Sequence, residues 1–183
     1  MEQINSNIIT QCQQGDKKAY RQLVQWYQGM VFSLALKMLG DEDEAKDITQ
    51  ETFIRVWTTL RKYDGSTTLS TWIYTIASRL CLDRLKKLKR QSPLPDDESV
   101  LADYISDTSP QRQLENHQWI SILRLLASEL SEKQRIVFTL SHLEGLSSEE
   151  IEAITGFDSR QVKSNLYVAR QTIRERLKRL GYE

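Results

Sequence analysis

A run of basic side chains near the C-terminus is the sharpest chemical pattern in this sequence. From Ser159 to Arg179, seven lysines and arginines stand against a single acid, Glu175. A helical wheel places five polar side chains on the face opposite Val162 and Leu166, namely Arg160, Gln161, Lys163, Ser164 and Asn165. Such side chains hydrogen-bond base edges and phosphates, so this face predicts binding to the major groove of duplex DNA. A solvated face of a helical bundle is the plainer alternative.

The residues just before this run strengthen the DNA interpretation. Ser147 and Glu150 form a capping-box pattern that opens a short helix, and Gly156 ends that helix. Asp158 or Ser159 then caps the basic helix. A short helix, a tight turn and a second helix with a polar face make up the helix-turn-helix motif, whose second helix enters the major groove.

A second basic block lies from Arg79 to Arg90, where six lysines and arginines stand against Asp83. Tyr63, Trp72 and Tyr74 lie just upstream. Aromatic rings next to cations suit single-stranded nucleic acid, since bases stack on the rings and phosphates contact the cations. Trp72 falls on the apolar stripe of its helix and is predicted to be core, whereas Tyr74 is predicted to face solvent.

A third block is acidic and contains Lys46 as its only cation: Asp41, Glu42, Asp43, Glu44, Asp47 and Glu51. Acids in the first turn of a helix interact favourably with the helix dipole, which explains the first four. Asp47 and Glu51 continue beyond that turn as an i,i+4 pair of like charge, which is destabilising. The pair therefore predicts a surface that binds a basic protein partner.

The sequence offers little for catalysis or for a bound cofactor. No phosphate-binding glycine loop, dinucleotide fingerprint or nucleophile elbow occurs. His117 and His142 are the only histidines, and neither has a cysteine or carboxylate at metal-ligand spacing. We therefore expect a protein that is not an enzyme and that needs no cofactor or metal.

No apolar run approaches the roughly 18 residues of a membrane span, and Cys12 and Cys81 form no disulfide pattern, so a cytoplasmic location is expected.

Composition predicts an all-α fold. With only 7 glycines and 3 prolines in 183 residues, the chain has few turn formers and so should consist of long helices. Apolar residues recur at helical spacing over 16–39, 41–60, 69–90, 114–130, 131–145, 147–156 and 158–177. Gly40 ends the first of these ranges, Asp41 with Glu44 and Ser131 with Gln134 form capping-box patterns, and Asp64 with Gly65 predicts a turn. Residues 91–112 contain every proline and many acids, which predicts a flexible acidic linker. Two small helical domains, 1–90 and 113–183, are expected on either side.

Three segments, taken together, resemble the extracytoplasmic-function (ECF) group of bacterial sigma factors. They are DEAKDITQETFIRVW (residues 43–57), LSTWIYTIASRLCLDRLKK (69–87) and LSEKQRIVFTLSHLEGLSSEEIEAITGFDSRQVKSNLYVARQTIRERL (130–177), in the order and separation of that group. The resemblance implies a dissociable RNA polymerase subunit that directs promoter-specific initiation. It implies that residues 1–90 form sigma region 2, which docks on core RNA polymerase and opens the −10 element. Residues 113–183 would form sigma region 4, which reads the −35 element as duplex.

The resemblance also implies roles for individual positions. The polymerase-binding candidates are Asp47, Gln50, Glu51 and Phe53. The candidates for single-stranded −10 DNA, including the aromatic and basic residues of the second block, are Tyr63, Trp72, Tyr74, Arg79, Asp83, Arg84, Lys86 and Lys87. The −35 candidates are Arg160, Gln161, Lys163, Ser164, Asn165 and Arg170. Anti-sigma factors are typical partners in the group.

Two other functions are compatible with parts of the pattern. One is a two-domain helix-turn-helix regulator that senses a ligand or dimerises and does not dock on polymerase. The other is an all-helical adaptor with no role on DNA. The acidic helix and the aromatic and basic segment over 69–90 argue against both, since neither alternative needs a surface that opens DNA strands.

Overall fold

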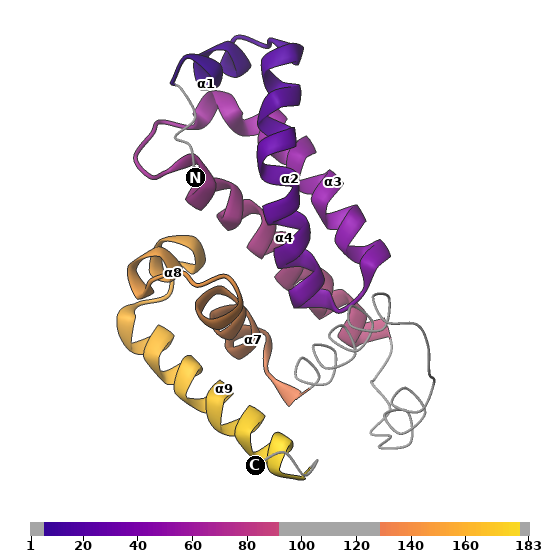
Figure 1. The fold of residues 1–183 in the computed structure, drawn as a ribbon, viewed down its shortest axis with the longest axis vertical. Coiled ribbons are helices and arrows are strands. Elements are labelled where there is room, and N and C mark those ends of the chain that lie inside the picture. Colours follow the sequence, from indigo (N-terminus) through magenta and orange to yellow (C-terminus); the bar gives the residue numbers. More distant parts are fainter. Residues whose placement is uncertain (1–5, 92–128, 180–183) are drawn as a thin grey trace, which may run out of the picture.

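Residues with strong capping preferences set the helix boundaries of the N-terminal half. The computed structural model describes residues 6–91 and 129–179, and every regular element in these ranges is a helix, as the all-α prediction requires (Figure 1). α2 (Lys17–Leu39) begins at Asp16, whose carboxylate accepts from two backbone N–H groups of the first turn. It ends at Gly40, which has the left-handed conformation (φ 67°) that favours glycine.

The next two helices follow the predicted ranges closely. α3 (Glu42–Thr59) leads through a 3₁₀ turn, η1 (Leu60–Lys62), and a loop to α4 (Leu69–Gln91). In that loop the Asp64 carboxylate accepts from the backbone of Ser66, and Gly65 has a φ of 78°, so the predicted turn is confirmed. α4 extends one residue beyond its predicted end.

A first helix, α1 (Ser6–Gln13), was not among the predicted elements. Cys12 on this helix is buried, and the Gln13 side-chain amide donates to the backbone oxygens of Leu60 (3.1 Å) and Tyr63 (2.9 Å). These bonds tie α1 to the turn between α3 and α4. A segment this short forms a stable helix only when tertiary contacts support it, which is why periodicity alone did not reveal it.

The C-terminal helices are α7 (Glu132–Phe138), α8 (Ser148–Thr155) and α9 (Ser159–Arg179). Two of the predicted capping boxes, Ser131 with Gln134 and Ser147 with Glu150, are present with reciprocal hydrogen bonds. Asp158 caps α9, since its carboxylate accepts from the backbone N–H of Gln161 at 2.7 Å. Between α7 and α8 lies a π-helical turn, η2 (Thr139–Leu143), in which the Glu144 N–H donates to the Thr139 oxygen at 3.0 Å.

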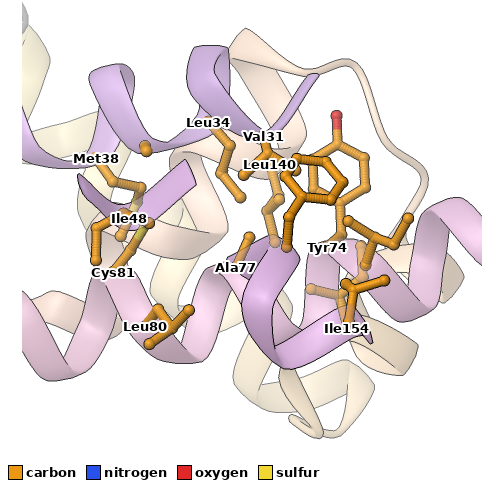
Figure 2. Close-up of a cluster of buried hydrophobic side chains, with 14 of the residues drawn as sticks. Val31, Leu34, Met38, Ile48, Tyr74, Ala77, Leu80, Cys81, Leu140 and Ile154 are labelled. Atoms are coloured by element: carbon orange, nitrogen blue, oxygen red, sulfur yellow. The ribbon is translucent and has the colours of Figure 1, made fainter. Parts of the chain in front are cut away.

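The two groups of helices share one continuous hydrophobic core. α4 lies against α7 and α8, and α2 contacts η2, while α9 packs on the outer side of α7 and α8 (Figure 1). Figure 2 shows Leu140 and Ile154 of the C-terminal group beside Tyr74 and Ala77 of α4. The predicted linker (91–112) lies outside the described residues except for Gln91, and so does the predicted helix 114–130 except for its last two residues. The domain boundaries therefore stay predictions.

Candidate protein and nucleic-acid interfaces

The recognition face predicted on α9 is exposed as the helical wheel required. Arg160, Gln161, Lys163 and Ser164 face solvent, and Val162 is only 1% exposed. Asn165 is half-buried, because its side-chain amide donates to the Gln161 backbone oxygen at 2.8 Å. The Gln161 side-chain oxygen accepts from the backbone of Asp158 at 3.1 Å, so its NH₂ group is the part of that amide that points away from the cap.

Tyr167 belongs to the same face and was missing from the predicted set. Its side chain is 63% exposed and borders an open hollow whose other lining residues are Ser159, Arg160, Lys163 and Ser164. The Tyr167 hydroxyl accepts from the side-chain amide of Gln171 at 2.8 Å. The signal was available in the sequence, since Tyr167 stands four residues after Lys163 and therefore shares its face.

Arg170 is held by a histidine from the preceding helices. Its Nε donates to Nε2 of His142 at 2.8 Å, and the His142 ring makes an edge contact with Phe138. Burial, and secondly the positive charge of Arg170, lower the pKa of His142. Neutral His142 therefore accepts from Arg170 and fixes the direction of its guanidinium.

The basic part of α4 is mostly exposed, as predicted for Arg79, Asp83, Lys86 and Lys87. Arg84 differs, because its guanidinium makes a two-point ion pair with the Glu44 carboxylate of α3, with Nη2 at 2.6 Å from Oε1. Glu44 was predicted to complete a capping box with Asp41. Only half of that box forms, since Asp41 accepts from the Glu44 N–H while the Glu44 side chain turns to Arg84.

The predicted solvent exposure of Tyr74 was wrong, whereas Trp72 packs against the core as predicted. Tyr74 is 6% exposed, and its hydroxyl donates to Oε2 of Glu144 at 2.8 Å (Figure 2 shows its ring in the core). Burial, followed by this hydrogen bond, raises the pKa of Tyr74 well above its usual range. Trp72 is partly exposed against Tyr63, with ring centroids 5.3 Å apart. A helical wheel of α4 contains no information about the C-terminal helices, and those helices cover the Tyr74 face.

The acidic edge of α3 is exposed, and the repulsion between its charges is weaker than the sequence implied. Asp47, Gln50 and Glu51 face solvent. Glu51 pairs with Arg55 one turn later at 2.6 Å, and Arg84 lies near both acids, so cations offset the repulsion between Asp47 and Glu51. The repulsion between Asp47 and Glu51, on which the prediction of a basic protein partner rested, is therefore largely removed.

Phe53, a predicted polymerase contact, is only 7% exposed and packs in the core. It forms the floor of a feature that the sequence analysis missed, an apolar groove of about 880 Å³ between α2 and α3. Side chains from both helices line this groove, among them Tyr20, Val24, Phe32, Phe53, Ile54 and Trp57. Ile54 is 57% exposed at its edge, next to Gln50. A second apolar stripe on α3, offset from the buried one, was the available signal.

The described residues contain no group of histidines, cysteines or carboxylates that could hold a metal ion. Burial raises the pKa of the Cys81 thiol to about 12, so this cysteine is a core residue and not a nucleophile. Among the helices of residues 6–91 and 129–179, none combines the length and the apolar composition that a membrane span requires.

Comparisons with known proteins agree on one family. The model for Sigma-70 region 2 matches residues 23–91, and that for Sigma-70, region 4, matches residues 120–173. The chain is 30% identical to the ECF RNA polymerase sigma factor SigW of Bacillus subtilis, over 98% of this chain and 100% of that protein. It is 28% identical to the RNA polymerase sigma-H factor of Pseudomonas aeruginosa, over 96% and 95%.

Two solved structures share the fold. CnrH in complex with the cytosolic domain of CnrY superposes with a TM-score of 0.67 at 20% identity, over 93% of this chain and 95% of that one. RpoE of Bartonella quintana in complex with the anti-sigma factor NepR gives 0.65 at 23% identity, over 88% and 98%. At these identities the likeness concerns the fold.

Proposed function

The chain belongs to the ECF group of RNA polymerase sigma factors, which direct promoter-specific initiation by RNA polymerase, and we propose that three surfaces divide this task. The first docks on core polymerase, the second binds the opened −10 element and the third reads the −35 element. A helix-turn-helix regulator without polymerase docking is not favoured, since the alignment with sigma factors runs over nearly the whole chain.

We assign the roles to the predicted domains. Residues 1–90 act as the region 2 domain, residues 113–183 as the region 4 domain, and residues 91–112 connect them. The chain has no catalytic role of its own, because phosphodiester formation belongs to the polymerase. Its site of action is then the cytoplasm, where the polymerase and the chromosome are.

The docking surface combines the α2–α3 groove with the acidic edge of α3. Ile54 supplies exposed apolar area, and Asp47 and Glu51 supply charge next to it. An apolar patch with a charged rim is the usual anatomy of a protein interface, and it fits a helical segment of polymerase that carries basic residues. Gln50 lies between the two parts and belongs to the same contact, whereas Phe53 supports the groove from below.

The −10 surface lies on α4 and the loop before it. Tyr63 and Trp72 offer partly exposed rings, and Arg79, Asp83, Lys86 and Lys87 line the exposed side of α4. Bases stack on such rings while lysine and arginine contact phosphates. Arg84 contributes to this surface while it is paired with Glu44. Tyr74 becomes available to DNA only when the C-terminal helices leave α4.

The −35 surface is the exposed face of α9. Arg160, Gln161 and Lys163 lie in its first turns, where a recognition helix contacts base edges. The exposed face continues with Ser164, Asn165 and Tyr167. The hydrogen bond with His142 orients Arg170 toward the DNA phosphates next to the bases that this face reads. Figure 1 shows α9 on the side away from α2–α4, so this face is open even in the present arrangement.

An anti-sigma factor is a further expected partner. The structural relative from Bartonella quintana was determined with the anti-sigma factor NepR, and CnrH with the cytosolic domain of CnrY. We propose that an anti-sigma factor binds this chain and holds it inactive by competing with polymerase for the α2–α3 surface.

The observation that carries the proposal is the presence of both a region 2 and a region 4 on one chain, with an exposed groove on the first and a polar recognition face on the second. Run-off transcription with purified core polymerase on a library of genomic fragments tests it. Specific transcripts that require the chain are expected. Nanomolar sequence-specific binding by the isolated chain, with no effect on polymerase, would instead favour the regulator.

A further inference from the structure

Five cations gather where α1, the start of α2 and the turn η1 meet. Gln13, the last residue of α1, donates its side-chain amide to the backbone oxygens of Leu60 and Tyr63, at 3.1 and 2.9 Å. These two acceptors flank Arg61 and Lys62 of η1. After Gln13 the chain turns within three residues into α2, which Figure 1 shows next to α1. We call the exposed cations gathered here the junction patch, and they are Lys17, Lys18, Arg21, Arg61 and Lys62.

The cations of the junction patch form no ion pair with any residue of 6–91 or 129–179, whereas Lys46, Arg55 and Arg84 of the N-terminal helices each pair with an acid. The acids nearest to the patch in the sequence are Asp16 and Asp64, and their carboxylates accept from backbone N–H groups instead. Five cations against two acids leave an excess of three positive charges. This face therefore attracts an anionic partner.

The composition of the junction patch favours the phosphates of a nucleic acid over a protein segment. Protein interfaces have an apolar centre and are poor in lysine. The large apolar side chains that are exposed in the described part of the chain all lie outside the patch, namely Trp26, Ile54, Tyr167 and Val168. Lysines and arginines without an apolar centre are typical of contacts with phosphate, which is bound mainly through charge.

The junction patch continues the −10 surface on the side away from the cations of α4. Lys62 directly precedes Tyr63, whose ring centroid lies 5.3 Å from that of Trp72. Arg79 follows Trp72 by seven residues, or roughly 10 Å of helix, and Figure 1 shows α4 leading away from α1. A strand with bases stacked on Tyr63 and Trp72 would therefore have the α4 cations in one direction and the junction patch in the other.

We propose that the junction patch binds the phosphates of the single strand that leads from the −10 element toward the transcription start. The proposal rests on the assignment of Tyr63 and Trp72 to −10 bases. The patch reads no sequence, since a contact with phosphate carries no base information. Because this part of the strand is single only after the promoter opens, binding to it shifts the equilibrium from the closed complex to the open one.

The test uses the full chain bound to core polymerase and a variant that removes three charges of the patch. This patch variant combines Lys18→Gln, Arg61→Gln and Lys62→Gln. Lys17 is kept, because it also lines the groove between α2 and α3. A charge-keeping variant carries Lys18→Arg, Arg61→Lys and Lys62→Arg. The matched control removes three exposed cations from the end of α9, and its substitutions are Arg174→Gln, Lys178→Gln and Arg179→Gln.

Two fork-shaped DNAs separate the patch from the rest of the −10 surface. Both carry a promoter found by the run-off experiment, begin downstream of its −35 element and are duplex up to the −10 element. In the short fork the single strand ends with the last −10 base. In the long fork it continues for about six nucleotides, a length that single-strand sites commonly cover. Fluorescence anisotropy across a salt series gives the affinity of each holoenzyme for each fork.

The patch variant should match wild type on the short fork and bind the long fork at least about threefold more weakly, because it loses three exposed ion pairs with phosphate. On the long fork, the slope of log affinity against log salt should be shallower by about 2, since each phosphate contact on a single strand contributes about 0.7. The charge-keeping variant and the α9 control should match wild type on both forks.

Several results would overturn the proposal. They are wild-type affinity of the patch variant for the long fork, an equal loss on both forks, and a loss in the charge-keeping variant as large as in the patch variant. Weaker binding of the patch variant to core polymerase without DNA would also overturn it, because a protein segment would then occupy the patch. If the wild-type holoenzyme binds the promoter forks no better than scrambled forks, the assigned −10 function fails as well. Should the patch variant fail to fold, as judged by circular dichroism, Lys62→Gln alone decides, with an expected change in slope of about 0.7.

Discussion

The guanidinium of Arg84 on α4 and the carboxylate of Glu44 on α3 form a two-point ion pair across the N-terminal helices. Both side chains are less than a third exposed, at 28% and 20%. The pair therefore links the helix assigned to polymerase docking with the helix assigned to −10 DNA. Its geometry is the planar, bidentate one that only arginine provides.

Breaking this pair should lower the stability of the N-terminal helices. Arg84→Lys keeps the charge and loses the two-point geometry, and Glu44→Gln loses the charge. Each should reduce the free energy of unfolding, with a coupling of about 1 kcal/mol between the two sites in a double-mutant cycle measured by urea denaturation. A coupling near zero would mean that the pair is no stronger than an ordinary surface contact.

The groove between α2 and α3 predicts that a charged substitution of Ile54 strongly weakens binding to core polymerase. Ile54→Asp should weaken binding to core polymerase at least about tenfold, because burying an isoleucine side chain is worth about 1.5–3 kcal/mol. Gln25→Asp is the control, as it places the same charge at an exposed position of α2 outside the groove. Biolayer interferometry with immobilised core enzyme measures both, and equal affinities would place the interface elsewhere.

The charges of Asp47 and Glu51 should mainly affect how fast polymerase binds, unlike the apolar contact made by Ile54. Reversal of Asp47 and Glu51 to lysine should reduce the association rate with polymerase, and the reduction should shrink as salt rises. Stopped-flow association across a salt series gives this result directly. A rate that is unchanged at low salt would remove these two acids from the docking surface.

On α9, different side chains should control specificity and general affinity. Tyr167→Ala and Arg160→Ala should relax the preference at individual −35 positions, by up to about 1–3 kcal/mol per lost base contact. Lys163→Ala should weaken all sequences alike and lower the salt slope by about 0.9. Holoenzyme competition assays on a randomised −35 library distinguish the two patterns. Tyr167→Phe keeps the ring and reports what the hydroxyl adds.

The bond between Arg170 and His142 should make the C-terminal helices sensitive to acid. The folded pKa of His142 lies below the unfolded value of about 6.5, so the unfolded chain takes up the proton first. This contribution to stability is complete above that value and is lost as the pH falls through the folded pKa. Urea midpoints of wild type and His142→Gln at pH 7.5 and pH 5.5 give the difference, which should be smaller at pH 5.5. An NMR titration showing a raised His142 pKa would reverse the expected sign.

Local rules accounted for most helix boundaries. Gly40, Ser131, Ser147 and Gly156 act as the caps that their types and spacing predicted, because capping depends on residues within one turn. The outward face of α9 was predictable for the same reason, since its stripe packs on α7 and α8 of the same group.

The missed features depend on contacts that are distant in sequence. A helical wheel of α4 alone places Tyr74 on the exposed face. In the structure its hydroxyl donates to Glu144, which is 70 positions away in the sequence. Phe53 appears in a docking motif, but its place beside Tyr20 and Trp57 makes it part of the groove floor. Glu44 fits a capping box, yet Arg84 offers its carboxylate a charged partner, and a charge-assisted bond is stronger than a neutral one.

The π-helical turn η2, which follows α7, contains one residue more than an α turn. Deleting one residue of Thr139–Leu143 would return this turn to regular α winding, so the side chains before and after it would keep their faces of the helix. The same deletion inside α7 or α9 would rotate everything after it by about 100° about the helix axis. Among descendants of this sequence, the loss of one codon should therefore be tolerated in η2 more readily than in α7 or α9.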